Sequence, residues 1–428
     1  MIKRIAMLSV HTCPLAMLGG KETGGMNVYV RDLSREFSRR GIDVDVYTRS
    51  QDPSVPRITP LAERSRVIHV KAGPEAPYNK NRIYNHLDEF VAGVQRQAQV
   101  DQLEYDIIYS HYWLSGLVAA SLRRSWHIPF VQMFHTLAEL KNRVAQTPVE
   151  REPQQRLDCE RAVMTMADRL IAATLLEQKE MAEYYGADPR QVSIVPPGVD
   201  LNRFKAMSRP EARAFLGIPP YHQMILFVGR IQPLKGIDTL IRALALIKKQ
   251  EPELVKNVCV CIIGGDPNQD SDYEKSELAR LKSLQAQLEL GDLVAFSGAR
   301  DQDSLIYYYS AAEMVVMPSH YESFGMVVLE AMACGAPVIA SDVGGLSFNI
   351  EDGYNGYLVP GRNPQAMADK IILLLKYRVL RDQLAEQALA WVTRYSWVNI
   401  AAELLEVFEE TLAQFRGQPE FDGKFASA

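Results

Sequence analysis

A chain of 428 residues is too long for one ordinary hydrophobic core, so two domains are expected. Hydrophobic residues make up 47% of it, charged residues 23%, and the formal net charge is −5. This balance gives no electrostatic reason to expect nucleic acid or an anionic membrane as the main partner. No apolar run reaches the ~18 residues that a membrane span needs. The five cysteines are odd in number and scattered, which indicates a reducing cytoplasm.

The amino-terminal half begins with a strand, a long loop and a helix. Residues 5–10 are apolar throughout, as in a parallel strand buried on both faces, and no small-residue cleavage site follows that would mark a signal peptide. The glycines at 24–25 start a helix whose apolar residues recur at helical spacing until Gly41 ends it. Glycines at a helix start let backbone N–H groups approach a phosphate closely, so Gly25 is a candidate ligand contact. The full dinucleotide-binding pattern Gly-x-Gly-x-x-Gly is absent.

Two short apolar strands, at 107–109 and 130–134, end in polar clusters. The first runs into Ser-His-Tyr-Trp, which contains Tyr112, and the second runs into His135 and Thr136. An α/β sheet presents its ligand at the carboxyl ends of its strands, so both clusters are expected at the site of the first domain. Of the eight histidines, His135 is the strongest candidate, with a purely structural histidine as the alternative.

Basic residues recur after these strands. Lys141, Arg143 and Arg151 lie in a polar loop. The following helix adds Arg156, and a separate loop contributes Lys80. A run of charges is most often a solvated surface, but cations from separate segments favour a site for an anion.

A proline-rich stretch at 196–200 divides the chain. A short helix that ends near Gly217 follows it, and an apolar strand at 224–228 then starts a second set of alternating strands and helices. A final amphipathic helix is expected from Ser396 to Leu412, with a frayed tail after it. The predicted units are residues 1–200, 201–395 and 396–428.

In the second half, cations flank the first strand-to-helix turn. The segment Gly-Arg-Ile-Gln-Pro-Leu-Lys-Gly follows the strand at 224–228 and carries Arg230 and Lys235. Two fixed cations at such a turn can neutralise a pyrophosphate. Arg300 follows a later strand at 294–296, and its planar guanidinium could stack on a base, with a plain surface charge as the alternative.

The segment 318–345 predicts a βαβ crossover. An apolar strand at 312–317 is ended by a proline, a helix follows at about 325–334, and a second strand lies at 338–340. Such units bind ligands at the carboxyl ends of their strands, so the loop after the first strand is the place to look for a site.

Two glutamates of this segment lie where a ligand would bind. Glu322 is in the loop after the strand, and Glu330 is eight residues later on the helix. Carboxylates at these places can grip two hydroxyl-bearing parts of one ligand. The helix start beside Gly325 offers free N–H groups and a partial positive charge to an anion. The alternative is an ordinary amphipathic helix with solvated glutamates.

Five phrases along the chain together resemble the retaining glycosyltransferases of family four, which have the GT-B fold. They are Gly-Gly-Met-Asn-Val-Tyr-Val, Ser-His-Tyr-Trp-Leu-Ser-Gly, His-Thr-Leu-Ala, Val-Gly-Arg-Ile-Gln-Pro-Leu-Lys-Gly and Glu-Ser-Phe-Gly-Met-Val-Val-Leu-Glu-Ala. The resemblance covers nearly the whole chain. It implies an α/β architecture in which two Rossmann-like, doubly wound domains face each other across a cleft, with a C-terminal helix that crosses back to the first domain.

The resemblance also implies a role for each candidate residue. A UDP-sugar would be the donor, and a phosphorylated sugar or cyclitol would be the acceptor. The implied donor contacts are Gly25, Arg300 on the uracil, Phe324, Gly325, and Glu330 on the ribose. The implied acceptor contacts are Asn27 beside the ring, with Lys80, Tyr112, Thr136 and Arg156 on the phosphate. The implied catalytic set is His135 on the face where the acceptor attacks, Arg230 and Lys235 on the pyrophosphate, and Glu322 on the sugar hydroxyls.

The family's chemistry can proceed with these residues alone. Breaking an anomeric C–O bond leaves an oxocarbenium-like centre and an anionic nucleoside diphosphate, whose growing charge the fixed cations stabilise. The resemblance implies no side-chain nucleophile, and the departing phosphate accepts the acceptor's proton on the same face of the sugar. We therefore expect no metal ion and no cofactor, the UDP-sugar being a substrate.

Two branches of the family differ in their acceptor. The nearer branch moves N-acetylglucosamine from UDP to inositol phosphate. The other makes sucrose phosphate from UDP-glucose and fructose 6-phosphate, and it has glutamine where this chain has Met26. A phosphorylase-like or epimerase enzyme of the same architecture and a non-catalytic sugar-nucleotide-binding module are the alternatives of other classes. We expect a cytoplasmic protein without a nucleic-acid partner, and a homodimer is left open.

Overall fold

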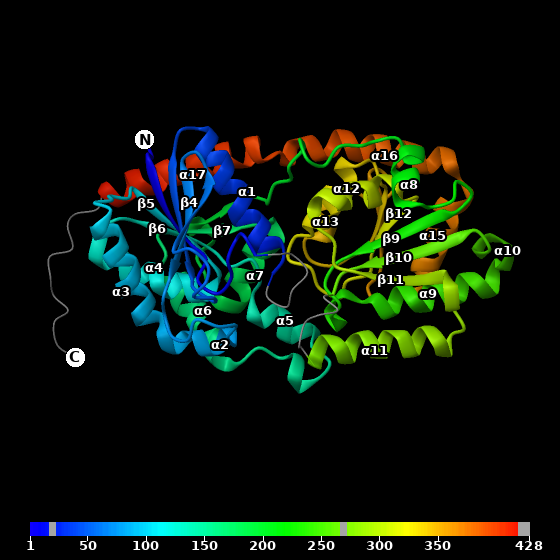
Figure 1. Cartoon of the computed structure of the whole chain (residues 1–428), viewed down its shortest axis with the longest axis horizontal. Helices are drawn as coiled ribbons and strands as arrows, with labels where there is room; N and C mark the ends of the chain where they lie inside the picture. Colours follow the sequence, from blue (N-terminus) through cyan, green and yellow to red (C-terminus); the bar gives the residue numbers. More distant parts are fainter. Residues whose placement is uncertain (17–22, 266–271, 418–428) are drawn as a thin grey trace.

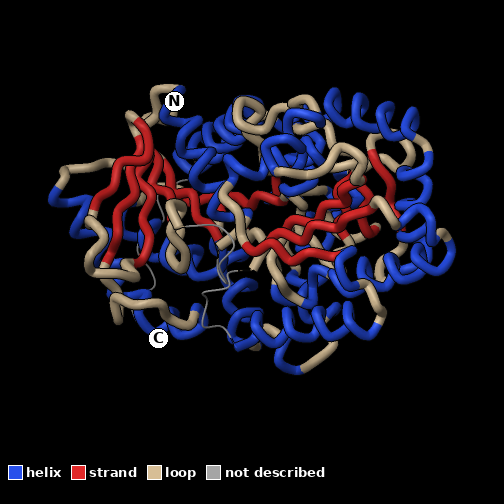
Figure 2. The backbone as a smooth tube through the Cα atoms, turned by 45° about the vertical axis from the view of Figure 1, so that its right-hand side comes forward, coloured by secondary structure: helices blue, strands red, loops and turns tan. Residues whose placement is uncertain are grey.

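The computed structural model describes residues 1–16, 23–265 and 272–417. Its strands form two separate sheets, each packed between helices (Figures 1 and 2). The predicted α/β architecture of two doubly wound units is thereby confirmed. The domain boundaries at 200 and 395 stay predictions, and the predicted frayed tail at 418–428 lies outside the described residues.

The first sheet belongs to the amino-terminal half. Its strands are β1 (Arg4–Leu8), β2 (Asp43–Arg49), β3 (Ile58–Ala62), β4 (Ser65–Val70), β5 (Ile107–His111), β6 (Phe130–Met133), β7 (Arg169–Ala172) and β8 (Val192–Ile194). They lie in the order β3-β4-β2-β1-β5-β6-β7-β8, and neighbours run parallel except β3 and β4. The interior strands are buried along nearly their whole length, which explains why they appear in the sequence as continuous apolar runs.

Helices on both faces cover this sheet. They are α1 (Gly25–Arg39), α2 (Lys80–Ile83), α3 (Leu87–Val100), α4 (Tyr112–Trp126), α5 (Ala138–Val144), α6 (Gln154–Met166) and α7 (Leu175–Tyr185). In α1, buried Val30, Leu33 and Phe37 recur at helical spacing and join the core.

The second sheet is parallel throughout. Its strands are β9 (Gln223–Val228), β10 (Val258–Ile263), β11 (Val294–Gly298), β12 (Met314–Met317), β13 (Val338–Ser341) and β14 (Gly356–Val359). They lie in the order β11-β10-β9-β12-β13-β14. Around them are α8 (Arg209–Leu216), α9 (Ile237–Gln250), α10 (Pro252–Val255), α11 (Asp272–Gln287), α12 (Gln302–Ala311), α13 (Met326–Ala333), α14 (Leu346–Asn349), α15 (Pro364–Lys376) and α16 (Arg378–Val392).

Several predicted boundaries are wrong. Lys141 and Arg143, expected in a loop, lie on α5, and the last helix continues to Arg416, past its expected end at Leu412. The helix after β5 was expected near Ser115, but α4 begins at Tyr112, directly after the strand. Tyr112 has a φ of 75°, which turns the chain sharply from strand to helix without an intervening loop. The conformation is unusual for a residue with a side chain, and no sequence pattern announces it.

The last helix, α17 (Trp397–Arg416), returns to the first domain as expected. The side chain of Ser396 caps it by accepting a hydrogen bond from the backbone N–H of Asn399 at 3.2 Å. On α17, Phe408 packs against Phe37 of α1, with ring centroids 6.0 Å apart. Figure 1 shows α17 running along the edge of the first domain while α16 lies over the second. The crossing helix therefore ties the two halves together.

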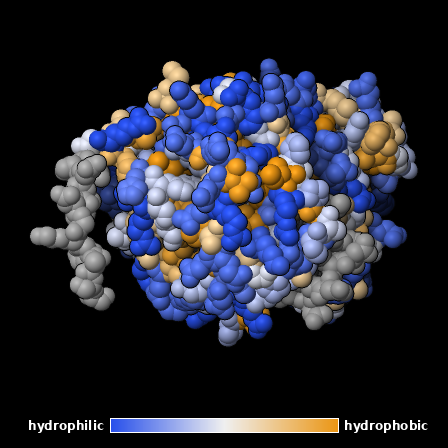
Figure 3. Space-filling model, turned by 60° about the vertical axis from the view of Figure 1, so that its left-hand side comes forward, coloured by the Kyte–Doolittle hydropathy of each residue, from blue (hydrophilic) through white to orange (hydrophobic). Residues whose placement is uncertain are grey.

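The surface is mixed in character. Figure 3 shows hydrophilic side chains over most of one face, with apolar ones scattered among them. Within the described ranges, no helix is long and apolar enough to cross a membrane.

Candidate active site

The site lies where the order of strands reverses in both sheets. In the first sheet, β1 has β2 on one side and β5 on the other, and in the second sheet β9 has β10 and β12 as neighbours. Chain connections leave such a point in opposite directions, which opens a crevice at the carboxyl ends of the strands. A cavity of ≈ 400 Å³ lies at these strand ends, lined by residues that follow β1, β5, β6, β9, β10 and β12.

Every site residue predicted from the sequence lines this one cavity. From the first half these are Gly25, Asn27, Lys80, Tyr112, His135, Thr136 and Arg156, and from the second half they are Arg230, Lys235, Arg300, Glu322, Phe324, Gly325 and Glu330. The individual roles assigned to them stay predictions.

Lys235 and Glu322 form an ion pair at the second sheet. Lys235 ends a 3₁₀ turn after β9, and Glu322 lies in the loop after the neighbouring strand β12. Gly236 allows the two loops to touch, because its φ is 64° and any side chain there would overlap the carbonyl oxygen of Pro318. A cation and a carboxylate thus stand together in the cavity lining, each at a strand end.

Two helix starts face each other across the cavity. Helix α13 begins after Gly325, whose φ is 91°. Helix α1 begins at Gly25, and a side-chain carbon built on Gly25 would lie 3.3 Å from the sulfur of Met326. The first N–H groups of a helix have no partner within the helix and carry a partial positive charge. The two starts together therefore favour an anion between the domains.

Glu330 is buried on α13 among neutral hydrogen-bond donors. The hydroxyl of Tyr309 donates to its Oε2 at 2.7 Å, and the amide of Gln302 donates to its Oε1 at 3.3 Å. Burial raises the pKa of the Glu330 carboxyl to about 7, although these hydrogen bonds oppose the rise. The carboxylate is thus poised between its charged and neutral forms near neutral pH.

On the first domain, Arg156 holds several segments together. Its Nε donates to Glu160 at 2.7 Å, and its Nη2 donates to the backbone oxygen and hydroxyl of Thr136 at 2.8 and 3.1 Å. The guanidinium also lies 4.6 Å from the ring centre of Tyr112. Three of the predicted acceptor contacts, from three different elements, are therefore in direct contact.

Two cavity-lining residues of this half have strained backbones. Tyr112 and His135 follow β5 and β6, and both have positive φ, 75° and 61°. The hydroxyl of Tyr112 is buried and has no hydrogen-bond partner among the residues that the structure describes. Strained backbone and an unused buried polar group are both typical of a ligand site.

His135 is a neutral imidazole. Burial lowers its pKa to about 3. Its Nε2 lies 3.0 Å from Nδ1 of His111, so one of these rings donates a hydrogen bond to the other. The Tyr29 ring packs edge-on against His135, with centroids 5.1 Å apart. His135 can therefore offer a hydrogen bond in the cavity but not a positive charge.

Family models match both halves of the chain. One described as Glycosyltransferase Family 4 covers residues 23–203, and one described as Glycosyl transferases group 1 covers residues 208–391. A D-inositol 3-phosphate glycosyltransferase of Actinosynnema mirum is 40% identical over 97% of this chain and 99% of its own. The chain belongs to family four of the GT-B glycosyltransferases.

The chain is also similar to further glycosyltransferases and to solved structures. A D-inositol 3-phosphate glycosyltransferase of Catenulispora acidiphila is 40% identical over 97% of this chain and 96% of its own. The structure of sucrose-phosphate synthase from Thermosynechococcus elongatus is 32% identical, with a TM-score of 0.87 over 96% of this chain and 100% of that one. The Anabaena protein HepE, solved with UDP-glucose, shares the fold, with a TM-score of 0.72 and 22% identity over 95% of this chain and 99% of that one.

In this glycosyltransferase, one predicted acceptor contact, Asn27, already makes hydrogen bonds within the protein. The amide of Asn27 donates to the hydroxyl of Thr12 and the carbonyl of Cys13, both at 2.7 Å. Its oxygen accepts from the N–H of Gly24 at 2.9 Å. Asn27 therefore joins Thr12 and Cys13 to the start of α1 as well as lining the cavity.

Several residues at or beside the site were not predicted from the sequence. Glu152 lies among the acceptor-side cations, and Gln302 binds Glu330. The ring of His11 packs at a tilt of 38° against that of Tyr112, with centroids 4.4 Å apart. Lys141 was noted as a base but was not assigned to the site, whose lining it joins. The one available signal was the position of Glu152 four residues before Arg156, the spacing of a helical ion pair.

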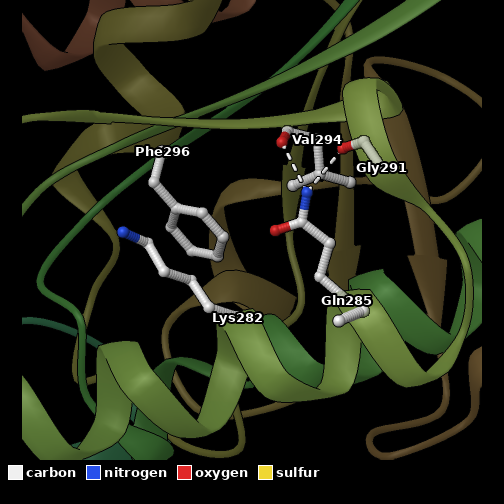
Figure 4. A pocket seen from close by; sticks show the side chains of 6 residues that line it. Lys282, Gln285, Gly291, Val294 and Phe296 are labelled. Atoms are coloured by element: carbon white, nitrogen blue, oxygen red, sulfur yellow. Dashed lines mark hydrogen bonds between the residues drawn. The ribbon is translucent and has the colours of Figure 1, made fainter.

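A second hollow lies away from the cleft, between α11 and β11 (Figure 4). The amide of Gln285 donates to the carbonyl oxygens of Gly291 at 2.7 Å and Val294 at 2.9 Å. The side-chain amide of Gln285, which lines this hollow, is thus already hydrogen-bonded to the backbone. We assign no site to it.

Proposed function

We propose that this glycosyltransferase moves a glucose-type sugar from a UDP-sugar to a small phosphorylated acceptor. The observation that carries the proposal is the convergence of Lys80, Tyr112, Thr136 and Arg156 on one side of the cavity. Cations and hydroxyl donors are what a phosphate dianion requires. A neutral sugar would bring these cations no charge beyond the carboxylates of Glu152 and Glu160 that already pair with them, whereas a phosphate dianion would.

The donor would lie on the opposite side. Arg230, Lys235 and the start of α13 would stabilise the negative charge that grows on the departing diphosphate. Glu322 would then leave Lys235 to the phosphate and bind sugar hydroxyls, and Glu330 would bind the ribose. Arg300 would contact the uracil; in the free protein its Nε donates to the hydroxyl of Tyr308 at 3.2 Å.

The reaction would proceed with retention at the anomeric carbon and without a metal ion or other cofactor. The departing phosphate would accept the proton of the acceptor hydroxyl on the same face of the sugar. His135 would line that face as a neutral hydrogen-bond group, in keeping with its lowered pKa. Its partly buried ring would also help to keep water away from the reacting carbon.

Two acceptors are worth trying in order. The names of the D-inositol 3-phosphate glycosyltransferases favour inositol phosphate. The likeness to sucrose-phosphate synthase keeps fructose 6-phosphate as the second candidate. Met26, which lines the cavity, stands where the sucrose-phosphate branch has glutamine, so we rank the cyclitol phosphate first.

Release of UDP measures the proposed activity. Purified protein is given UDP-glucose or UDP-N-acetylglucosamine, together with each acceptor in its phosphorylated and dephosphorylated form. We expect turnover with a phosphorylated acceptor and much less with its plain form. Equal kcat/KM for the two forms would overturn the phosphate requirement, and nucleotide binding without any turnover would indicate a binding module.

Two further measurements test the mechanism. Proton NMR of the first product formed reports the anomeric configuration, and we expect the configuration of the donor. Excess chelator should leave the rate unchanged. Inversion, or a rate that chelator abolishes and a divalent ion restores, would contradict the mechanism while leaving the substrates in place.

A further inference from the structure

Glu152 lies behind the cavity lining, paired with the cations of the predicted phosphate site. Its Oε1 forms an ion pair with Lys141, lies 3.0 Å from Nη1 of Arg156 and lies 3.9 Å from the ammonium of Lys80. The side chain is only 7% exposed. Burial alone would raise the pKa of this carboxyl, but the charges of Arg156, Lys80 and Lys141 lower it to about 2. The free protein thus pairs an anion of its own with the cations that the acceptor's phosphate is expected to meet.

The carboxylate is held by its own loop. Glu152 precedes α6, and its backbone N–H donates to the side-chain oxygen of Asn142 at 2.7 Å. The amide of Asn142 donates back to the carbonyl oxygen of Glu152 at 3.3 Å. These bonds fix the backbone, while the side chain has three rotatable bonds. The carboxylate can therefore leave the cations without unfolding the loop.

Glu152 neutralises the cations but does not use all the donors around them. Nη1 of Arg156 lies close to it, yet this atom makes no hydrogen bond within the described residues. The buried hydroxyl of Tyr112, whose ring packs against the same guanidinium, also makes no hydrogen bond within the described residues. Idle buried donors are costly, and a group with more acceptor oxygens than a carboxylate would satisfy them.

We propose that Glu152 is a specificity-determining residue, whose carboxylate stands in for the acceptor's phosphate and must be displaced by it. The inference rests on the proposed phosphorylated acceptor. A phosphate carries more charge and more acceptor oxygens than a carboxylate, so it competes well for Lys80, Lys141 and Arg156. A neutral hydroxyl does not, because displacing Glu152 would leave the cations uncompensated. Glu152 thereby makes the phosphate a condition for entry and weakens the binding of every anion at the site.

Glu152→Gln tests the inference, since the amide keeps the shape and removes the charge. Calorimetric titration with inorganic phosphate should show binding at least about 10-fold tighter in this variant than in the wild type, because a charge competing a few ångströms away is removed. The KM for the phosphorylated acceptor should fall in parallel. Unchanged or weaker phosphate binding would overturn the inference, because it would mean that Glu152 remains in place and orients the cations.

Two more variants complete the design. Glu150→Gln changes the same charge in the same loop, but Glu150 accepts hydrogen bonds from Gln146 at 2.9 Å and Thr147 at 3.0 Å instead of contacting the cations. It should bind phosphate like the wild type. Glu152→Asp keeps the charge on a shorter side chain, so it should bind phosphate more tightly than the wild type and less tightly than Glu152→Gln. It also serves if the amide variant does not fold, and weaker phosphate binding in it would contradict the inference.

The outcome separates this inference from the proposed function. A wild type that requires a phosphorylated acceptor, with variants at Glu152 that do not bind phosphate more tightly, contradicts the role of Glu152 alone. A wild type that neither binds phosphate nor distinguishes the two acceptor forms contradicts the proposed function, and the inference with it.

Discussion

Glu330 and Glu152 are buried carboxylates on different domains, and their surroundings shift their pKa values in opposite directions. Glu330, on the second domain, receives hydrogen bonds from the neutral groups of Tyr309 and Gln302, and burial raises its pKa to about 7. Glu152, on the first domain, lies among cations that lower its pKa to about 2. The carboxylate of the second domain thus has neutral hydrogen-bonding partners. The carboxylate of the first domain is paired with cations.

The two halves also differ in how their charged residues are paired in the absence of substrate. In the free protein the second domain pairs Lys235 with Glu322, residues that both have a predicted role with the donor. The first domain instead pairs its cations with a residue that has no such role. With the proposed roles, donor binding would separate the pair of Lys235 and Glu322, whereas acceptor binding would displace Glu152 from the cations.

The largest effect is expected on the donor side. Glu322→Gln and Lys235→Ala should each lower kcat by at least ~100-fold, the scale of losing one preorganised contact to the transition state. Steady-state UDP release measures this, and Lys249→Ala, an exposed lysine on α9, is the matched control. Near wild-type rates in both variants, with folding intact, would remove the donor-site assignment.

The opposite pKa shifts predict opposite dependences of stability on pH. Folded Glu330 keeps its proton up to about pH 7, while the unfolded chain releases it near 4.5. The free energy of unfolding should therefore fall as the pH rises from 4.5 to 7, by about 3 kcal/mol for this one group at ~1.4 kcal/mol per pKa unit. Glu330→Gln should remove that part of the fall. Buried Glu177, whose pKa burial also raises to about 7, contributes separately.

For Glu152 the sign is reversed. Its folded pKa lies below the ordinary 4.5, so its ion pairs stabilise the protein above that pH and the contribution is lost as the pH falls toward 2. Glu152→Gln should flatten the curve below pH 4.5 and leave its shape above unchanged. Urea titrations between pH 3 and 8 measure both variants. The comparison fails if the two substitutions alter the same pH range.

Much of the site could be predicted because most residues of its donor side come from only two short segments of the sequence. Arg230 and Lys235 lie in one turn, and Glu322 and Glu330 lie in one loop and helix. Each segment follows an apolar strand, and the rule that ligands bind at strand ends places both in one crevice. The adjacency of β9 and β12 then brings Lys235 to Glu322 without any further information.

The acceptor side was predicted less completely because it is assembled from distant segments. Residue types alone identify Lys80 and Arg156 as cations, but no periodicity shows which acid they meet in space. Glu152 therefore appeared as one more charge in a polar loop. Gln302 was missed for the same reason, since its hydrogen bonds to Glu330 and to Arg203, the latter at 2.8 Å, join residues far apart in the sequence.

Removing an acceptor-side cation should have a smaller effect than breaking the donor pair. Lys80→Ala should lower kcat/KM for the phosphorylated acceptor about 10- to 100-fold, the ~1.5–3 kcal/mol of a hydrogen bond to a charged group. Affinity for UDP and activity with the plain acceptor should hardly change. Arg156→Ala should raise the acceptor KM similarly. This substitution also removes the cation that pairs with the buried carboxylate of Glu160, so the folding of the variant has to be checked. An equal loss for both acceptor forms would contradict the assignment.

The smallest effect is expected from matched tyrosine substitutions on the two sides. The hydroxyl of Tyr112 has no partner in the described part of the chain, whereas that of Tyr309 donates to Glu330. Tyr112→Phe should therefore leave the melting temperature unchanged or slightly higher and lower kcat/KM for the phosphorylated acceptor about 2- to 10-fold, the ~0.5–1.5 kcal/mol of one hydrogen bond. Tyr309→Phe should instead lower the melting temperature, because it takes a donor from a buried carboxyl. Thermal unfolding and acceptor kinetics on both variants measure the contrast. A loss of stability in Tyr112→Phe with unchanged acceptor kinetics would mean that the idle hydroxyl serves the fold and not the phosphate.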